Sequence, residues 1–144
     1  QIPEAGKFTF LDSGWMEQTC KDCLNGLEEE DYAKRIDSIK HFERQLTDNG
    51  YLVLKFFMQI DKKEQEKRFR QRQENPEKQW KITEEDWRNR EKWEQYEEAV
   101  NEMLIRTSTE YAPWIVVEGN DKYYARLKVL ETVIDALEKR ISKK

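Results

Sequence analysis

The sequence predicts an α/β fold in which a parallel β-sheet carries helices on both faces. Short apolar runs at residues 7–12, 51–60 and 114–118 alternate with longer amphipathic stretches, as in βαβ units. The middle run, YLVLKFFMQI, is almost continuously apolar, which is typical of a strand covered on both faces. Three strands form a narrow sheet for so many helices. We therefore expect these residues to belong to a larger domain.

Composition limits the classes of partner. The chain has 144 residues, of which 37% are hydrophobic and 39% charged, and its formal net charge is -4. An acidic total argues against nonspecific binding to nucleic acid, which usually requires a basic excess. No apolar run approaches the roughly 18 to 20 residues that span a bilayer, so we expect no membrane association. Two cysteines provide no disulfide framework, and a cytoplasmic location is the expectation.

Local signals place the first strand and the first helix. The run KFTFLD at residues 7–12 lies between Gly6 and a Ser-Gly turn, and it predicts a buried strand ending in Asp12. From Asp31 onward, apolar residues recur at helical spacing until Asn49-Gly50 supplies a left-handed stop. The apolar positions of this helix are Tyr32, Ile36, Ile39, Phe42 and Leu46.

Three further helices follow. Asp61 can cap a helix, with Glu64 completing a pair that resembles a capping box, and Asn75-Pro76 ends that helix. Thr83 caps a second helix that we expect to continue to about Thr107. The last is an amphipathic helix with apolar positions Tyr123, Leu127, Leu130, Ile134, Leu137 and Ile141.

Asp12 is the first candidate site residue. An acid at the end of a strand lies at the carboxyl edge of a parallel sheet, where open α/β folds bind ligands. In phosphoryl-transfer enzymes such an acid holds Mg²⁺. Asp-Ser-Gly is also a common turn sequence, so Asp12 can equally be only the start of a turn.

Positive charge gathers between Arg68 and Lys81, where fourteen positions carry five cations: Arg68, Arg70, Arg72, Lys78 and Lys81. One interpretation is an exposed helical face whose arginines pair with glutamates at helical spacing. The other rests on Pro76, which leaves a basic loop containing Trp80 between two helices, the shape of a lid. Lids of phosphate-transferring kinases expel water and bring cations against phosphate oxygens.

Other motifs carry less weight. Cys20 and Cys23 match C-x-x-C but have no second pair of cysteines and no nearby histidine to complete a metal site. His41, the single histidine, lies among apolar helix positions and is expected on a helix surface or in packing. Gly6-Lys7 lacks the preceding strand, the earlier glycine and the following hydroxyl of a phosphate-binding loop.

Taken together, three segments resemble the polyphosphate kinase 2 family, in particular its two-domain polyphosphate:AMP phosphotransferase branch. They are DSGWM at residues 12–16, HFERQLTDNGYLVLKFFMQIDKKEQEKRFRQRQENPEKQWKITEEDW at 41–87 and STEYAPWIVVEGNDKYYARL at 108–127. The resemblance implies a P-loop kinase fold with a helical lid. It also implies Mg²⁺-dependent transfer of phosphate between inorganic polyphosphate and a nucleotide, AMP or ADP.

The resemblance also implies roles for individual residues. It makes Asp12 the strand-end acid that binds Mg²⁺ and places a lid at about residues 66–90. Of the lid cations, it gives Arg68 and Arg72 catalytic roles and Lys78 and Lys81 substrate-binding roles. After the last strand it implies substrate binding by Asn120, Asp121, Lys122 and Arg126.

Two features depart from the family pattern. Family members usually carry Asp-Arg-Ser-Trp-Tyr at the strand end, whereas Ser13 follows Asp12 here, so an arginine is absent. The family's glycine-rich loop does not occur in the sequence, and we expect residues 1–144 to be the C-terminal part of one domain, inactive by itself. Association with a second copy of the domain is expected. The alternative function is that of a non-catalytic structural or dimerisation half of a tandem-domain phosphotransferase. A helical RNA-binding module is a third and more remote hypothesis.

Overall fold

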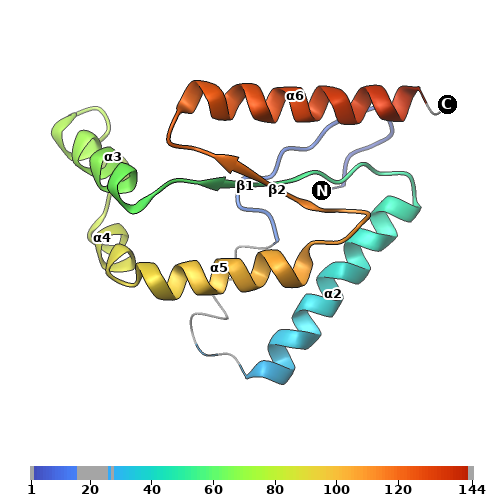
Figure 1. Ribbon diagram of the computed structural model, residues 1–144, viewed down its shortest axis with the longest axis horizontal. Helices are drawn as coiled ribbons and strands as arrows, with labels where there is room; N and C mark the ends of the chain where they lie inside the picture. The colour runs from blue at the N-terminus through green and yellow to red at the C-terminus, as the bar shows by residue number, and fades with distance from the viewer. Residues whose placement is uncertain (1, 16–25, 27, 143–144) are drawn as a thin grey trace.

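The computed structural model describes residues 2–15, 26 and 28–142. Two parallel strands lie between helical layers, with α6 on one side and α2 and α5 on the other (Figure 1). The elements in chain order are α2 (Glu29–Asp48), β1 (Lys55–Gln59), α3 (Lys62–Glu74), the 3-10 helix η1 (Gln79–Lys81), α4 (Glu84–Glu91), α5 (Trp93–Thr107), β2 (Trp114–Glu118) and α6 (Lys122–Ile141). This arrangement confirms the predicted α/β class with helices on both faces of a parallel sheet.

The sheet is short and regular. β1 pairs with β2 in parallel, from Lys55 opposite Trp114 to Gln59 opposite Glu118. Both strands therefore end at the same edge, and α3 and α4 lie beyond that edge (Figure 1). Polar groups at the two strand ends are thereby brought close together.

The core lies between the sheet, α2 and α5. Its centre is formed by Ile39 of α2 with Ala99 and Met103 of α5. Partly buried side chains close this cluster from the surrounding elements: Trp15, Val100, Leu104 and Trp114. Apolar positions three or four residues apart on each helix thus meet across the α2–α5 contact.

Several predicted helix ends are confirmed. The Asp61 carboxylate accepts a hydrogen bond from the backbone N–H of Glu64 at 2.7 Å, capping α3. Thr83 caps α4 in a reciprocal capping box with Asp86. After α2, Gly50 has a φ of +86°, the left-handed conformation that glycine adopts without a steric penalty.

The strand predicted at residues 7–12 was wrong. No strand is assigned there, and Phe8, Phe10 and Leu11 are exposed by 67%, 87% and 54%. An apolar run forms a strand only when a neighbour satisfies its backbone hydrogen bonds. Among the described residues the sheet contains β1 and β2 alone, so this run has no partner strand.

The strand predicted at residues 51–60 is shorter in the structure and less buried than expected. Only residues 55–59 pair, because β2 offers five partner residues. Met58 and Val116 are exposed by 51% and 38%, so the sheet faces are not completely buried.

The single helix expected from Thr83 to Thr107 is two helices, which meet at Lys92. α4 packs Trp87 against Phe69 of α3, whereas α5 packs on α2. Because the two helices serve different partners, the chain changes direction between them (Figure 1). Within the described part of the chain, no helix is long and apolar enough to cross a membrane.

Candidate functional site

The loops that follow the two strands are joined by hydrogen bonds. The backbone N–H of Asp61 donates to the side-chain oxygen of Asn120 at 3.1 Å, and the Asn120 amide donates to the Asp61 carboxylate at 2.7 Å. Asp61 follows β1 and Asn120 follows β2, so this reciprocal pair joins the ends of neighbouring strands. Hydrogen bonds to its carboxylate depress the pKa of Asp61 below its ordinary value; the bond from the Glu64 amide is the largest cause, and the bond from the Asn120 amide is the next.

Gly119 allows the two loops to approach. Its N–H donates to the carbonyl of Gln59 at 2.6 Å. A Cβ at this position would lie 3.0 Å from both the Gln59 carbonyl oxygen and a methyl carbon of Ile60. A side chain would therefore push the β2 loop away from β1, which explains glycine at this point of the edge.

Arg68 links α3 to the same loops. Its guanidinium donates to the carbonyl of Gly119 at 2.6 Å and to that of Asn120 at 3.1 Å, and its Nε donates to Glu64 at 2.7 Å. The Arg68 side chain is only 17% exposed. The hydrogen bond from Arg68 is also the largest cause that lowers the pKa of Glu64. In this conformation the guanidinium is occupied by protein acceptors, so Arg68 positions α3.

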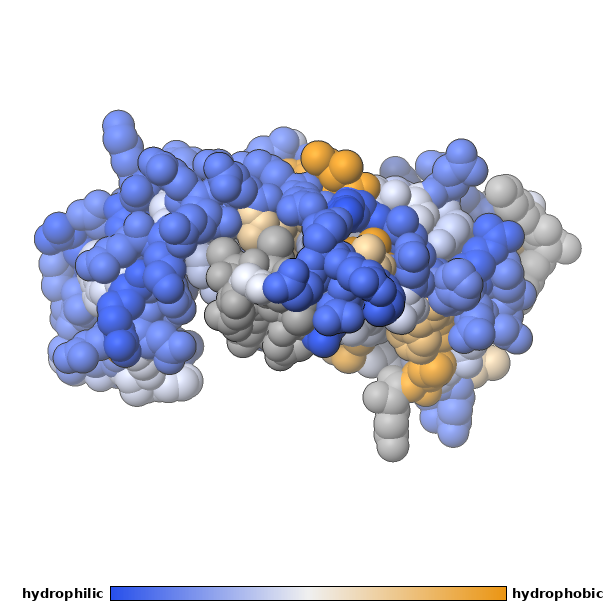
Figure 2. Space-filling model, turned by 90° about the horizontal axis from the view of Figure 1, so that it is seen from below, coloured by the Kyte–Doolittle hydropathy of each residue, from blue (hydrophilic) through white to orange (hydrophobic). Residues whose placement is uncertain are grey.

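Residues 62–91 form a helix-turn-helix unit, which we call the helical arm. Phe69 and Trp87 meet edge to face, with ring centroids 5.3 Å apart. Arg90 of α4 donates to the Lys62 carbonyl at 2.7 Å and to the Glu66 carboxylate at 2.8 Å. Sequence reasoning did not single out Arg90, because its partners lie more than twenty positions away. The arm lies beyond the sheet edge, and its surface is almost entirely hydrophilic in Figure 2.

Of the five cations between Arg68 and Lys81, three remain available. Arg72 and Lys78 make no ion pair or hydrogen bond through their side chains in the part of the chain that the structure describes. Lys81 lies over the Trp80 ring at 5.0 Å, and Trp80 is 76% exposed. Arg70, by contrast, pairs with Glu66 at 2.8 Å. Arg70 therefore fits the interpretation as a paired helical surface, whereas Arg72, Lys78 and Lys81 have the free charge that the lid interpretation requires.

The segment after β2 is brought to the same edge, with mixed roles. The Asp121 carboxylate accepts hydrogen bonds from the N–H groups of Tyr123 and Tyr124 at 2.8 and 3.1 Å, so it caps α6. Lys122 is exposed and has no side-chain partner among the described residues. Arg126 stacks over the Tyr123 ring at 5.8 Å, one turn into α6.

Asp12 is exposed, and its carboxylate has no partner among the described residues. It begins a tight turn in which Ser13 has a φ of +66°, a left-handed conformation that is uncommon for a residue with a side chain. No hydrogen bond or ion pair connects Asp12 to the other predicted site residues.

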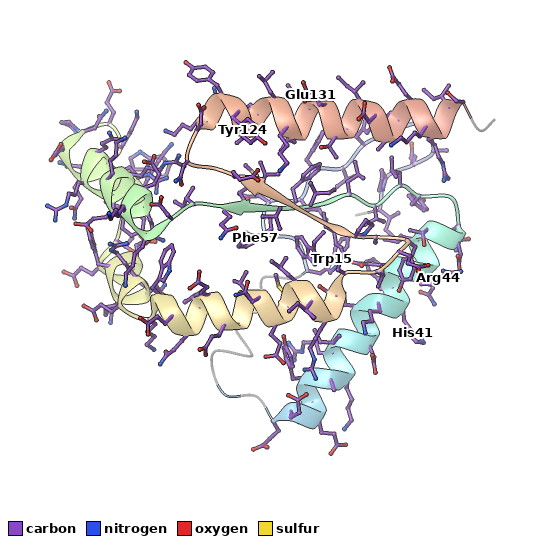
Figure 3. All side chains as sticks on the ribbon, viewed as in Figure 1. Trp15, His41, Arg44, Phe57, Tyr124 and Glu131 are labelled. Atoms are coloured by element: carbon purple, nitrogen blue, oxygen red, sulfur yellow. The ribbon has the colours of Figure 1, made fainter. Side chains whose placement is uncertain are left out.

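Trp15 anchors this turn. Its indole N–H donates to the Glu43 carboxylate at 3.1 Å, and its ring meets Phe42 edge to face at 5.2 Å. Figure 3 shows Trp15 in the region where the sheet, α5 and α2 meet. The turn that carries Asp12 is thereby attached to the core.

Glu43 also belongs to a buried ionic network. Its carboxylate accepts from the Lys55 ammonium at 2.8 Å, and Lys55 donates further to the Thr107 carbonyl at 2.7 Å. Burial lowers the pKa of Lys55 below its ordinary 10.5, and the adjacent Glu43 opposes that shift. Sequence reasoning missed this network, although a lysine interrupting an apolar strand is the signal that could have revealed it.

The carboxylates of the described residues offer few ligands for Mg²⁺. Across residues 2–15, 26 and 28–142, no group of three or more His, Cys, Asp or Glu side chains could hold a metal ion. Mg²⁺ commonly takes only one or two carboxylates and completes its shell with water and substrate phosphates. The free carboxylate of Asp12 fits that limited protein contribution.

A hollow of about 350 Å³ lies elsewhere, on α2. His41, Arg44 and Tyr111 are among the residues that line it, and His41 and Arg44 lie at the end of the molecule opposite the arm (Figure 3). His41 is exposed on the helix, which is the first of the two positions expected from the sequence, a helix surface or packing. Cys20 and Cys23 lie outside the described residues.

Comparison with known proteins decides the family. The sequence profile described as polyphosphate kinase 2 matches residues 1–144. The chain belongs to the polyphosphate kinase 2 family. It is 46% identical to a polyphosphate:AMP phosphotransferase of Pseudomonas syringae pv. tomato, over 99% of this chain and 29% of the relative. It is 47% identical to the protein of the same name from Pseudomonas aeruginosa, over 95% of this chain and 28% of the relative.

Solved structures of the polyphosphate kinase 2 family agree with the fold. A structure from Pseudomonas aeruginosa superposes with a TM-score of 0.92 and 46% identity, covering 99% of this chain and 31% of that one. A second, from Arthrobacter aurescens, gives a TM-score of 0.82 and 35% identity, covering 85% of this chain and 44% of that one. The chain thus spans about a third of the length of its most similar relatives among these.

Proposed function

We propose that these residues supply the carboxyl edge and the lid of a domain that transfers phosphate between inorganic polyphosphate and a nucleotide, AMP or ADP. The names of the relatives support this substrate class. The observation that carries the proposal is the Arg68 bridge to Gly119 and Asn120, because it holds a basic arm beside the strand ends. Arg72, Lys78 and Lys81 are left free to meet phosphate oxygens.

The proposed role of the arm is electrostatic. A phosphoryl group in transfer carries charge on its oxygens, and positioned cations stabilise that charge. Arg72 offers a planar fork that can hold two phosphate oxygens, while Lys78 and Lys81 act as point charges. Exclusion of water by a closed arm strengthens each of these contacts.

Asp12 is proposed to hold Mg²⁺, directly or through a bound water molecule. When bound, the ion would neutralise part of the phosphate charge. Trp15 and Glu43 would fix the turn from which Asp12 projects. Lys122, Arg126 and Asn120 are proposed to line the substrate side of the β2 loop, with Asp121 capping α6 behind them.

A second candidate function is a non-catalytic half that associates with a second copy of the domain. Ser13 favours it, because the residue after Asp12 lacks the positive charge expected near the phosphates. A further observation is the apolar outer face of α6, where Leu127, Leu130 and Ile134 are more than half exposed.

Binding of inorganic polyphosphate as a function of salt tests the first function. The triple variant R72A/K78A/K81A should bind more weakly, and the slope of log K against log salt should fall by about 2, since each lost phosphate contact removes about 0.7. The control K34A/K40A/K139A removes the same charge away from the arm and should keep the slope. Equal slopes for parent and arm variant would place the binding site elsewhere.

A further inference from the structure

Helix α6 has two opposite apolar faces. One faces the sheet, where Ala125 is 4% exposed and Val129 and Val133 are partly buried. The other faces outward, and no described element covers α6 on its outer side in Figure 1. Its exposed members are Tyr123 (77%), Leu127 (58%), Leu130 (58%), Ile134 (51%) and Ile141 (71%). Together with the partly buried Leu137 they form what we call the α6 seam.

The spacing of the α6 seam is that of a coiled coil. Its residues follow one another at steps of four, three, four, three and four, which is the a/d pattern of a heptad repeat. Leu127, Ile134 and Ile141 then occupy a positions, and Tyr123, Leu130 and Leu137 occupy d positions. Isoleucine at a with leucine at d favours two parallel strands. A helix that only covers a sheet has no need for this second face.

Charges beside the seam favour the parallel orientation. Arg126 occupies a g position and Glu131 the following e position, and in a parallel pair these two meet across the interface. An antiparallel pair with full overlap would instead bring Arg126 toward Arg140 of the second copy and Glu131 toward Glu131 of the second copy, which places like charges together. Among the described residues, the Arg126 side chain stacks over the Tyr123 ring of its own helix and makes no ion pair, and Glu131 has no ion-pair or hydrogen-bond partner.

The seam is short, but α6 does not depend on the seam in order to fold. An isolated coiled coil of fewer than three heptads must pay for ordering its helices. Here α6 is already held by the sheet, with Ala125 buried and Lys128 paired to Glu118 at 2.6 Å. Docking therefore orders side chains only, and each buried leucine or isoleucine adds to association.

We propose that the α6 seam binds the α6 seam of a second copy of this chain, in parallel and about a two-fold axis. This inference specifies the surface used in the second candidate function above. It does not depend on phosphate transfer.

Sedimentation velocity of the 144-residue chain, from micromolar to submillimolar concentration, tests the interface. The parent should pass from monomer to dimer. L130K/I134K should weaken association by more than roughly tenfold, because two apolar contacts are replaced by like charges. The control D135K places the same side chain off the seam and should associate as the parent does. A monomeric parent, or a dimeric L130K/I134K variant with parent affinity, overturns the proposal.

Charge reversal tests the orientation. R126E and E131R should each weaken association roughly two- to tenfold, and R126E/E131R should restore it. Stronger association of R126E would indicate the antiparallel pair and overturn the proposed geometry. Polyphosphate binding by L130K/I134K is measured in a separate experiment. It reports on the proposed phosphotransfer function independently of association, since no seam residue lies on the helical arm.

Discussion

Lys55 of β1 and Glu43 of α2 form a salt bridge of 2.8 Å in which the two side chains are only 6% and 0% exposed. The Lys55 ammonium also lies 5.2 Å from the centre of the Trp114 ring. Because burial removes both charges from water, each depends on the other for compensation. The pair joins α2 to the sheet, and through Trp15 it reaches the turn that carries Asp12.

Replacing one member of this pair should destabilise the protein strongly. Lys55→Met leaves the Glu43 carboxylate buried without its cation, and we expect a loss of about 3 to 5 kcal/mol in the free energy of unfolding. Lys55→Met/Glu43→Leu should lose less than the single variant, because it buries no unpaired charge. Urea denaturation measures both. A single variant that loses less than about 1 kcal/mol would show that the pair is solvated.

Arg68 should hold the helical arm against the β2 loop. In Arg68→Ala the arm loses its bonds to Gly119 and Asn120, so proteolytic cleavage within residues 62–91 should become several-fold faster. Arg70→Ala is the matched control, since Arg70 is exposed and pairs only within α3. Cleavage sites are identified by mass spectrometry. Equal cleavage rates in the two variants would mean that Arg68 is not the anchor.

Asp61 should make stability depend on acid pH. Its pKa in the folded protein is lower than the ordinary 3.8, so its contribution is complete above 3.8 and disappears as pH falls through the folded value. Asp61→Asn keeps a capping side chain but does not titrate. The stability difference between parent and variant should therefore shrink on acidification. Urea denaturation at several pH values measures it, and a difference constant across this range contradicts the assignment.

Asp12 should be essential for turnover but not for folding. In a polyphosphate kinase 2 chain that joins these residues to a glycine-rich loop, Asp12→Asn should abolish Mg²⁺-dependent transfer to AMP or ADP. The unfolding free energy should change by less than about 1 kcal/mol, because Asn also fits the turn. The 144 residues contain no such loop and should show no turnover alone. Full activity of Asp12→Asn would reduce Asp12 to a turn residue.

The sequence by itself determined the features that depend on close neighbours along the chain. The caps at Asp61 and Thr83 and the stop at Gly50 each rest on residues within one helical turn, and all three were predicted. The alternation of apolar runs and amphipathic helices likewise predicted a parallel sheet covered on both sides. These features can be predicted from the sequence because they are stabilised by local hydrogen bonds and by burial of apolar residues at a regular spacing.

Only the tertiary structure decided which distant residues meet. Arg68 donates hydrogen bonds to carbonyls 51 and 52 positions away, and Lys55 donates to a glutamate on another element. Residues 7–12 have strand-like composition but no ladder, because backbone pairing requires a partner that local sequence does not specify. The outer face of α6 looked like an ordinary core stripe until the sheet proved to lie on its other side. Burial and pairing are properties of two segments at once, and one segment cannot reveal them.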